Sequence, residues 1–247
     1  DDEIIRVLQL PNAVIQPNGP IAICSPNTVT LSASNQFAAY SWSPGGATTS
    51  SITVGQSGSY AVTVTDPNNG CVATSQPVQV TVNSTVPPTI VPSGPTEFCY
   101  GGSVSLSVAP GPYNSFLWTS GSTTPSIVVT ETGDYGVTVI DANNCTDSTL
   151  LSNPIHIEVW NPSPIVDQQG DSVVVLNGPF AQYQWFFNGQ PVPGATGPVF
   201  HPSQSGNCSV QVWDENGCTD NSFNVEFTFT GVADISSSFD VNLYPNP

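Results

Sequence analysis

Hydrophobic and polar residues alternate in short stretches along most of this chain, and each stretch ends at a turn rich in Gly, Pro, Asn or Asp. In SYAVTV (59–64), Tyr60, Val62 and Val64 fall on one face, and the residues between them fall on the other. The stretch VQVTV (78–82) alternates in the same way. A period of two is typical of a β-strand with one buried face. Because no window keeps apolar residues at helical spacing over three turns, the pattern predicts an all-β chain of short strands.

The same strands recur along the chain. PNGPIAIC (17–24) returns as PSGPTEFC (92–99), and SGSYAVTV (57–64) returns as TGDYGVTV (132–139) and SGNCSVQV (205–212). Each long strand is followed by a similar turn, here named the F–G turn: DPNNGC (66–71), DANNC (141–145) or DENGC (214–218). Repetition at about 75 residues predicts three copies of one small domain. We place repeat 1 at 11–86, repeat 2 at 87–162 and repeat 3 at 163–232, with stiff Pro-rich linkers at 86–88 and 161–164.

Two features make each copy resemble an immunoglobulin-like β-sandwich. A Trp lies near the middle of each copy, where strand C of such a sandwich carries its buried Trp; these are Trp42, Trp118 and Trp185. SGSY and TGDY resemble the tyrosine corner that opens strand F. With about seven short strands per copy, the sequence predicts tandem immunoglobulin-like β-sandwich domains. Val stands where an antibody domain has its strand-F Cys, so any disulfide differs from the antibody one.

The charge of the chain restricts its function. The 247 residues include 18 that are acidic, Arg6 as the one Arg, and no Lys, which gives a net charge of -17. Nucleic-acid binding is excluded, because contacts with phosphate need Lys or Arg. No apolar run reaches about 18 residues, so we expect no membrane span. Beyond Arg6 a trypsin-like protease finds no bond to cut, which would suit a chain exposed to extracellular proteases; compositional drift is the alternative.

Six Cys in a chain without Met indicate an oxidising compartment. No signal peptide is visible, so we expect Asp1 to lie within a processed or trimmed chain. The repeat alignment predicts that all six Cys pair within their own repeats, as Cys24–Cys71, Cys99–Cys145 and Cys208–Cys218. Loop closure would contribute about 4 kcal/mol for each of the first two bonds and about 2.7 kcal/mol for the third. Metal binding is the alternative, and the lack of a CxxC pair argues against it.

The string YQWFFNGQPVPGAT (183–196) resembles one that recurs in immunoglobulin-like repeats of secreted Bacteroidota proteins. The GxYxVxV and NGC strings fit the same family, so the resemblance covers nearly the whole chain. It implies the fold and an extracellular or cell-surface location, and it says little about a ligand.

The end of the chain, 233–247, is interpreted as a linker and the truncated start of another domain. LYPNP follows the Ser-rich ISSS (235–238) and resembles the opening of the C-terminal sorting domain that the type IX secretion machinery recognises. A chance turn is the alternative. The residues of this sorting motif are Leu243, Tyr244, Pro245, Asn246 and Pro247.

The chain offers little catalytic chemistry. His156 lies in the alternating strand PIHIEV, and His201 lies beside a turn in FHPSQSG; the other copies have no His at these places. There is no G-x-S-x-G motif and no phosphate loop. An enzyme needs several polar groups that converge, so we predict no enzyme, no catalytic residue and no cofactor. The isolated carboxylates are interpreted as solvated: Asp167, Asp171 and Glu215.

Asp and Asn cluster in the F–G turns, and their oxygens could hold Ca²⁺. Turn chemistry explains them without an ion, so we predict no metal site. These residues are Asp66, Asn68, Asn69, Asp141, Asn143, Asn144, Asp214 and Asn216.

Two kinds of surface site are compatible with sugars. Trp160 and Trp213 are candidates for glycan contacts, although packing against a neighbouring domain is the preferred interpretation. DST (147–149) and DSV (171–173) resemble the short O-glycosylation signal of this phylum, which makes Ser148 and Ser172 candidate acceptors.

The first ten residues, DDEIIRVLQL, are strongly apolar but precede repeat 1. Repeat 1 is complete without them, and a lone apolar strand is not stable in water. They are either the last strand of a preceding domain or a strand donated to a neighbouring subunit. The candidate donor-strand residues are Ile4, Ile5, Val7, Leu8 and Leu10.

These observations favour a non-enzymatic extracellular protein with a structural or adhesive role. We expect a stiff row of domains that forms a surface fibre, stalk or adhesin and polymerises head to tail by strand donation. The alternative is a spacer or carbohydrate-binding region of a larger type IX-secreted enzyme. The expected partners are copies of the chain itself, the type IX secretion machinery and surface glycans.

Overall fold

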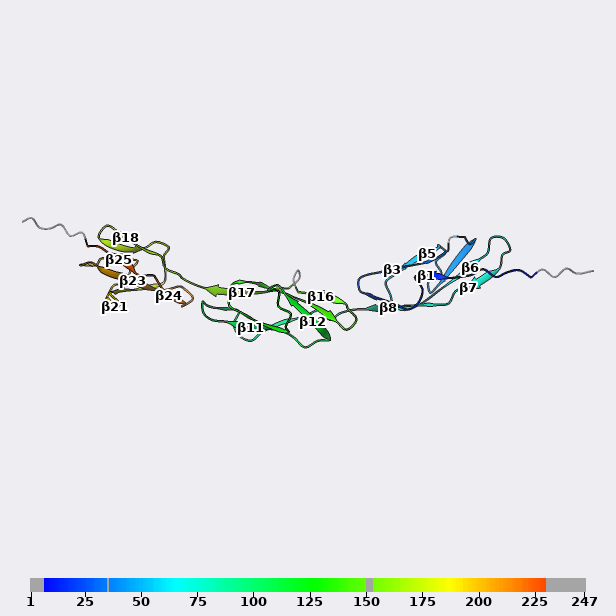
Figure 1. The fold of residues 1–247 in the computed structure, drawn as a ribbon, viewed down its shortest axis with the longest axis horizontal. Coiled ribbons are helices and arrows are strands. Elements are labelled where there is room, and N and C mark those ends of the chain that lie inside the picture. The colour runs from blue at the N-terminus through cyan, green and yellow to red at the C-terminus, as the bar shows by residue number, and fades with distance from the viewer. Residues whose placement is uncertain (1–6, 35, 150–152, 230–247) are drawn as a thin grey trace, which may run out of the picture. The chain divides into compact units, whose positions relative to one another are not determined.

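The computed structural model describes residues 7–34, 36–149 and 153–229 (Figure 1). Over these ranges the chain is all-β, with 25 strands and no helix. A helix able to cross a membrane is therefore not found in the described part of the chain. The chain forms two compact units, one of residues 1–94, 105–128 and 134–156 and one of residues 95–104, 129–133 and 157–247. Because both units contain parts of repeat 2, the boundaries of the three repeats stay a prediction.

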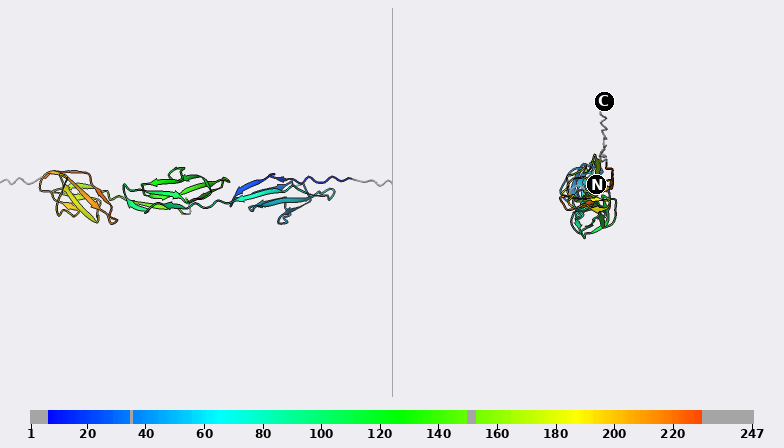
Figure 2. Two further views of the ribbon diagram at one scale, coloured as in Figure 1. Left: turned by 90° about the horizontal axis from the view of Figure 1, so that it is seen from below. Right: turned by 90° about the vertical axis from the view of Figure 1, so that its left-hand side faces the viewer.

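Repeat 1 lies in the first unit and folds into two sheets. The first sheet has the order β1-β3-β5, from β1 (Ile15–Gln16), β3 (Val29–Ala33) and β5 (Ser51–Val54). The second has the order β2-β8-β6-β4, from β2 (Ile21–Cys24), β8 (Val78–Asn83), β6 (Gly58–Thr65) and β4 (Ala39–Ser43), with β7 (Val72–Thr74) also paired to β6. Strand β2 runs parallel to β8, and the other pairs are antiparallel. Figure 2 shows these strands, coloured blue to cyan, side by side.

The alternation seen in the sequence decides which side chains form the core. In β6 the side chains of Tyr60, Val62 and Val64 are buried, as predicted, and Trp42 of β4 packs in the same cluster. The Tyr60 hydroxyl donates to the carbonyl oxygen of Gln56 at 3.0 Å, which confirms the tyrosine corner in repeat 1.

All three predicted core Trp residues are buried, and each satisfies its indole N–H in the same way. Nε1 of Trp42, Trp118 and Trp185 donates to a backbone carbonyl at 2.8, 2.8 and 2.9 Å, respectively. A buried indole that keeps this hydrogen bond contributes its apolar area without leaving a polar atom unpaired. The Trp therefore fixes the same loop to the core in every repeat.

Repeat 2 contributes nine strands among the described residues. They are β9 (Ile90–Pro92), β10 (Glu97–Cys99), β11 (Val104–Val108), β12 (Tyr113–Trp118), β13 (Ser126–Val129), β14 (Gly133–Tyr135), β15 (Val137–Asp141), β16 (Thr146–Ser148) and β17 (Ile155–Trp160). The sheet orders are β13-β11-β9, β12-β15-β16 and β10-β17-β14. Strand β10 runs parallel to β17, as β2 does to β8 in repeat 1.

Repeat 3 lies in the second unit. One sheet has the order β18-β19-β22, from β18 (Val166–Gln169), β19 (Ser172–Val175) and β22 (Val199–Phe200). The other has the order β21-β20-β23-β24, from β21 (Gln190–Pro191), β20 (Gln182–Phe187), β23 (Gly206–Trp213) and β24 (Thr219–Asn221), with β25 (Val225–Phe227) also on β23. Asn188 and Gly189 both have positive φ and close the two-residue hairpin between β20 and β21.

A hydroxyl that the sequence analysis missed lies directly after the strand that follows the F–G turn in each repeat, which is β7, β16 or β24. The Ser75 hydroxyl accepts the N–H of Val62, the Thr149 hydroxyl that of Val137, and the Ser222 hydroxyl that of Val210, at 3.1, 2.9 and 2.9 Å. The backbone N–H of each hydroxyl residue donates back to the same Val. A small hydroxyl residue twelve or thirteen positions after that Val is the sequence signal that was available.

Candidate functional site

Among the described residues the structure contains two disulfides, and both connect consecutive repeats. In the first unit Cys24 bonds Cys145, and in the second unit Cys99 bonds Cys218. The Cα atoms are 5.5 and 5.3 Å apart, inside the usual range for a disulfide. The predicted bonds Cys24–Cys71, Cys99–Cys145 and Cys208–Cys218 are therefore wrong, and Cys71 and Cys208 are thiols.

Strand direction explains why Cys24 does not reach Cys71. Cys24 is paired in register with Asn83 in the parallel strands β2 and β8, so it lies where the chain leaves repeat 1. The F–G turn with Cys71 follows β6, which is antiparallel to β8, so the turn lies at the opposite end of the sheet. The eight residues of β6 separate the two ends by roughly 23 Å at about 3.3 Å per residue, far beyond the reach of a disulfide.

The same reasoning corrects the two other predicted pairs. Cys99 is in register with Trp160 at the end where the chain leaves repeat 2, whereas Cys145 lies in the F–G turn. Cys208 lies near the start of β23, opposite Phe187, whereas Cys218 follows the end of that strand. Cys208 is fully buried in the repeat 3 core, and this burial raises the pKa of its thiol.

Hydrogen bonds hold the linker beside the disulfide of the first unit. The Thr85 hydroxyl donates to Oδ2 of Asp147 at 3.2 Å, and the Tyr113 hydroxyl donates to the carbonyl of Pro87 at 3.2 Å. Burial raises the pKa of Tyr113, and the nearby Asp147 carboxylate raises it further. The phenol therefore stays protonated and can donate. The chain is thus attached to repeat 2 just before the two linker prolines and at the first of them.

The linker in the second unit is held by one side chain. Asn177 donates through Nδ2 to the carbonyl of Ser163 at 2.9 Å and accepts the N–H of Ile165 at Oδ1 at 2.8 Å. Because both bonds are made to backbone, they fix the path of the chain as it begins repeat 3.

The Asp residues of the F–G turns have the turn role that was predicted. Oδ1 of Asp141 accepts the N–H groups of Asn143 and Cys145 at 2.8 and 2.9 Å, and Oδ1 of Asp214 does the same in repeat 3. These oxygens order the turn that presents the Cys, as Asp side chains commonly do. In the described part of the chain, no group of three or more His, Cys, Asp or Glu is arranged to hold a metal.

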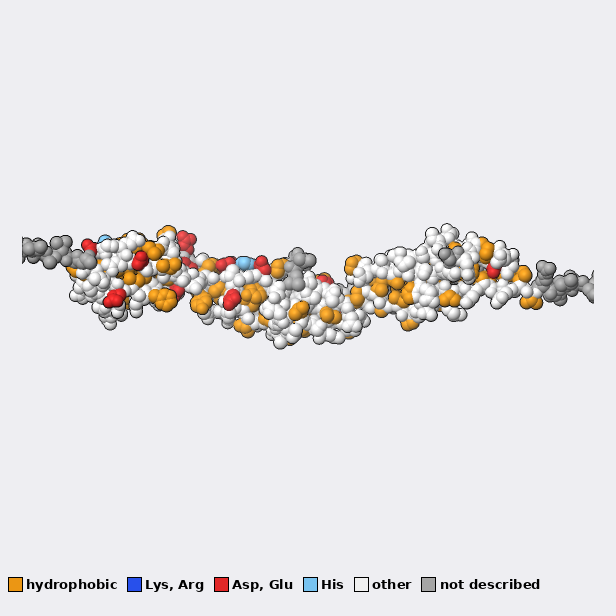
Figure 3. All heavy atoms as spheres, turned by 45° about the horizontal axis from the view of Figure 1, so that its top comes forward, with side chains coloured by type: hydrophobic (Ala, Val, Ile, Leu, Met, Phe, Trp, Pro, Cys, Tyr) orange, Lys and Arg blue, Asp and Glu red, His pale blue; other side chains and the backbone are white. Residues whose placement is uncertain are grey.

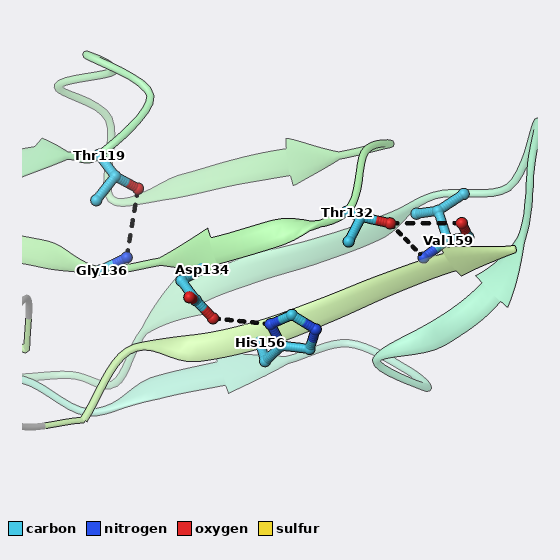
Figure 4. Close-up of polar contacts among 6 residues, drawn as sticks. All are labelled: Thr119, Thr132, Asp134, Gly136, His156 and Val159. Atoms are coloured by element: carbon cyan, nitrogen blue, oxygen red, sulfur yellow. Dashed lines mark hydrogen bonds and ion pairs between the residues drawn. The ribbon is translucent and has the colours of Figure 1, made fainter.

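His156 lies on an exposed strand, as predicted, and interacts with Asp134. Its Nδ1 is 2.8 Å from Oδ1 of Asp134, and both side chains are more than half exposed (Figure 4). Such a pair stabilises a protein only weakly. Its high exposure is unlike the enclosed setting in which catalytic pKa values are tuned.

His201 lines a hollow in repeat 3. Its Nδ1 is 2.8 Å from the Ser172 hydroxyl, and the hollow of about 240 Å³ is otherwise lined by Phe187, Val192, Phe200, Pro202, Ser203 and Gln204. Among these lining residues, His201 is the one titratable side chain. The hollow is therefore lined by one imidazole among uncharged side chains.

The described surface carries no Lys or Arg, since Arg6 lies outside it. On the face shown in Figure 3, acidic side chains are sparse among uncharged ones. Trp160 and Trp213 are both half-buried, while Val210 and Val212 point inward as expected. The two candidate glycosylation sites lie in strands: the Ser148 hydroxyl accepts from Thr138 at 3.1 Å, and Ser172 contacts His201. Glycosylation stays a prediction.

The N-terminal candidate strand is described in part. Ile4 and Ile5 lie outside the described residues, as does the sorting motif at 243–247. Val7, Leu8 and Leu10 are 92%, 53% and 65% exposed. Nδ2 of Asn69 donates to the carbonyl of Gln9 at 3.2 Å, which holds this segment against the F–G turn of repeat 1.

This chain is a tandem array of immunoglobulin-like β-sandwich domains. The features that define the class are the paired sheets, the buried Trp at the strand-C position and the tyrosine corner of repeat 1. No family model and no curated protein matches the sequence. Among solved structures, it is similar to Sidekick-1 immunoglobulin domains 1–4, with 12% identity, 89% of this chain and 76% of that chain covered, and a TM-score of 0.27. It is also similar to the N-terminal four Ig domains of Dscam1 isoform 6.9, with 14% identity, 90% and 74% covered, and a TM-score of 0.25. The fold assignment rests on the strand pairings above, and we infer nothing about function from these neighbours.

Proposed function

We propose that this chain is a non-enzymatic extracellular protein with a structural or adhesive role, a row of immunoglobulin-like domains that serves as a surface stalk or fibre. The observation that carries the proposal is the pair of disulfides that join consecutive repeats. Disulfides persist in oxidising compartments, which supports an extracellular location. Bonds between domains, unlike bonds within them, resist separation of the domains under load.

The order of the cysteines makes the two bonds act together. Cys99 lies inside the loop closed by Cys24 and Cys145, and Cys145 lies inside the loop closed by Cys99 and Cys218, so the two loops interlock. When the chain is pulled from its ends, the shortest covalent path from Cys24 to Cys218 crosses both bonds and only the 46 residues between Cys145 and Cys99, so the two bonds together remove 148 residues from the stretched path. Cys24–Cys145 alone would remove 121, and Cys99–Cys218 alone would remove 119. Either bond is therefore sufficient to protect most of repeats 1 and 2 or of repeats 2 and 3.

Single-molecule pulling of the full chain tests the load-bearing role. Reduction should lengthen the fully stretched chain by roughly 500 Å, since the 148 residues that the two bonds remove from the path extend by about 3.3–3.6 Å each. The Cys24→Ser variant should stretch roughly 100 Å further than the parent, because Cys99–Cys218 alone removes 119 residues from the path and the two bonds together remove 148. The Cys145→Ser, Cys218→Ser double variant should match the reduced chain. An oxidised parent that reaches the reduced length would contradict the proposal.

Export and assembly form a further part of the proposal. The resemblance of 243–247 to the start of a type IX sorting domain supports secretion by that route in a member of the Bacteroidota. The exposed apolar side chains of Val7, Leu8 and Leu10 support strand donation to a neighbouring sheet, which propagates head to tail when the contact does not close. Deletion of residues 1–10 should abolish any concentration-dependent assembly seen by sedimentation and electron microscopy. Filaments formed by the truncated chain would contradict strand donation.

A carbohydrate-binding region of a larger secreted enzyme is the second candidate. The aromatic walls of the hollow at Phe187 and Phe200 favour it, since sugars stack on aromatic rings. Binding on a glycan array that is lost in Phe200→Ala, but kept in the exposed control Phe223→Ala, would support this role over the stalk.

A further inference from the structure

The three F–G turns hold Cys71, Cys145 and Cys218 in the same backbone setting. In each turn the N–H of the opening Asp donates to the carbonyl oxygen of the Cys, at 2.9 Å in repeat 1 and 3.0 Å in repeats 2 and 3. The turn of repeat 1 is one residue longer, and Asn69 takes over the side-chain bond to the Cys N–H that Asp makes in the other turns. The three cysteines are therefore structurally equivalent.

Two of these equivalent cysteines share one kind of partner. Cys145 and Cys218 each bond a Cys that ends the parallel strand of the preceding repeat, and both are 1% exposed. Cys71 is a thiol and is half-buried. The sites in repeats 2 and 3 thus show that a Cys at this position bonds the Cys that ends the parallel strand of the preceding repeat. Among the described residues, Cys71 has no disulfide partner of this kind.

The segment that leads into repeat 1 approaches the turn as a linker does. Since Cys24 corresponds to Cys99, Gln9 corresponds to Ser84 in the linker between repeats 1 and 2. Gln9 accepts from Asn69 in the F–G turn of repeat 1, and Thr85, the neighbour of Ser84, donates to Asp147 just after the F–G turn of repeat 2. Both segments therefore contact the repeat that follows them beside its F–G turn.

The sequence before Gln9 also matches the end of a repeat. In the same alignment Ile5 and Val7 correspond to Val80 and Val82 of β8, the last strand of repeat 1. Residues 4–10 thus have the pattern of a last strand, whether the rest of that repeat belongs to the same polypeptide or to a neighbour.

We propose that Cys71 is a covalent docking site: it forms a disulfide with the Cys that ends the parallel strand of another immunoglobulin-like repeat, seated on the F–G turn of repeat 1. The inference rests on the proposed stalk function and names its next covalent partner. In this chain Cys24 and Cys99 are already bonded, so the partner is a further repeat of the same type.

The bond forms by thiol–disulfide exchange with a disulfide oxidant such as oxidised glutathione. The Cys71 thiolate attacks one sulfur of the oxidant, whose S–S bond breaks and releases one thiolate. The partner thiolate then attacks the Cys71 sulfur and releases the second. Two electrons pass to the oxidant, and the two protons lost by the cysteines end on its two thiols.

Duplication of residues 12–86 within the full chain tests the proposal. The duplicated chain consists of residues 1–86, then a second copy of 12–86, then 87–247, which keeps the natural spacing at each linker. Cys71→Ser in the first copy leaves one Cys71, that of the second copy. After oxidation with glutathione, alkylation and peptide mapping should find this Cys71 bonded to Cys24, with Cys24–Cys145 and Cys99–Cys218 also present. Adding Cys24→Ser in the first copy should restore the Cys71 thiol and leave the two other bonds intact.

The outcomes separate this inference from the proposed function. A Cys71 that stays a thiol or carries glutathione, while the two other bonds form, overturns the inference and leaves the stalk intact. Failure of all three bonds overturns both. The same peptide map on protein from its own cells identifies the source of the partner. If the protein has the same mass on reducing and non-reducing gels, the bond lies within one polypeptide. If the mass is larger without reduction, the bond joins two polypeptides. A partner that is not an immunoglobulin-like repeat overturns the inference.

Discussion

The Cα atoms of Cys24 and Cys145 lie 5.5 Å apart, although 121 residues separate them in the sequence. The contact arises because β2 runs parallel to β8, which brings Cys24 to Asn83, where the chain passes into repeat 2. The F–G turn of repeat 2 presents Cys145 at that point. The disulfide of Cys24 therefore joins two sandwiches, whereas the predicted Cys24–Cys71 bond would have lain within one.

Removal of this bond should weaken the first unit. The Cys24→Ser, Cys145→Ser double variant is expected to lower the free energy of unfolding by up to about 4–5 kcal/mol, since the bond closes a loop of 121 residues in the unfolded chain. Urea denaturation followed by Trp fluorescence measures the change. The matched control is Cys71→Ser, which removes a thiol without a bond and should stay within about 0.5 kcal/mol of the parent. Equal losses in both variants would argue against the assigned pairing.

The two free thiols should differ sharply in reactivity. Cys71 is half-buried, and Cys208 is fully buried. A maleimide reagent should label Cys71 in the folded protein and Cys208 after denaturation, because reaction needs an accessible thiolate. Mass spectrometry of the labelled peptides checks this. Labelling of Cys24 in the folded, unreduced protein would conflict with the Cys24–Cys145 bond, and labelling of Cys218 would conflict with the Cys99–Cys218 bond.

Burial of Cys208 should make the stability of repeat 3 depend on alkaline pH. Its pKa is raised above 9.0 in the folded state, so the unfolded chain loses this proton first as pH rises. The contribution is fully present below pH 9 and is lost as pH rises through the folded pKa. Compared with Cys208→Val, which keeps an apolar side chain of similar volume, the parent should lose more stability as pH rises above about 9, where the thiol of the unfolded chain ionises. If the free energy of unfolding falls equally with pH in the parent and in Cys208→Val, the titration of Cys208 does not contribute to stability.

The Thr149 hydroxyl should stabilise its strand through one buried hydrogen bond. Thr149→Val keeps the shape but leaves the N–H of Val137 without its acceptor, which should cost about 1–3 kcal/mol. Thr146→Val in the preceding strand β16 is the control, because Thr146 is exposed and the change should be close to neutral. Chemical denaturation measures both. A control as unstable as Thr149→Val would point to strand propensity rather than to the hydrogen bond.

Both histidines should be dispensable. The His156→Ala, His201→Ala double variant is expected to unfold within about 1 kcal/mol of the parent, because it loses an exposed ion pair and a surface hydrogen bond. Parent and variant should be equally inactive towards ester, glycoside and peptide substrates. Activity in the parent that disappears in the variant would establish a catalytic role.

The sequence by itself determined the strands, the repeats and the core. Alternation in β6 placed Tyr60, Val62 and Val64 inside, and the recurring Trp marked the centre of each sandwich, because side-chain direction and burial follow from local periodicity. It also identified the roles of Asp141 and Asp214, since a turn is built from neighbouring residues. These features depend on contacts within a few residues or between adjacent strands.

The tertiary structure alone decided the disulfides. The alignment correctly shows that Cys24 corresponds to Cys99 and that Cys71 corresponds to Cys145, but correspondence does not say at which end of a sandwich each Cys lies. That depends on the parallel pairing of β2 with β8, a contact between strands more than fifty residues apart that leaves no local pattern. Likewise, Ser75, Thr149 and Ser222 recur at a similar spacing after Val62, Val137 and Val210, but the spacing alone does not show that their hydroxyls accept hydrogen bonds. That role depends on the pairing of β7, β16 and β24 with the long strand of each repeat. Local periodicity indicates which face of a strand is buried. Which strand ends lie together depends on pairing between segments that are distant in the sequence.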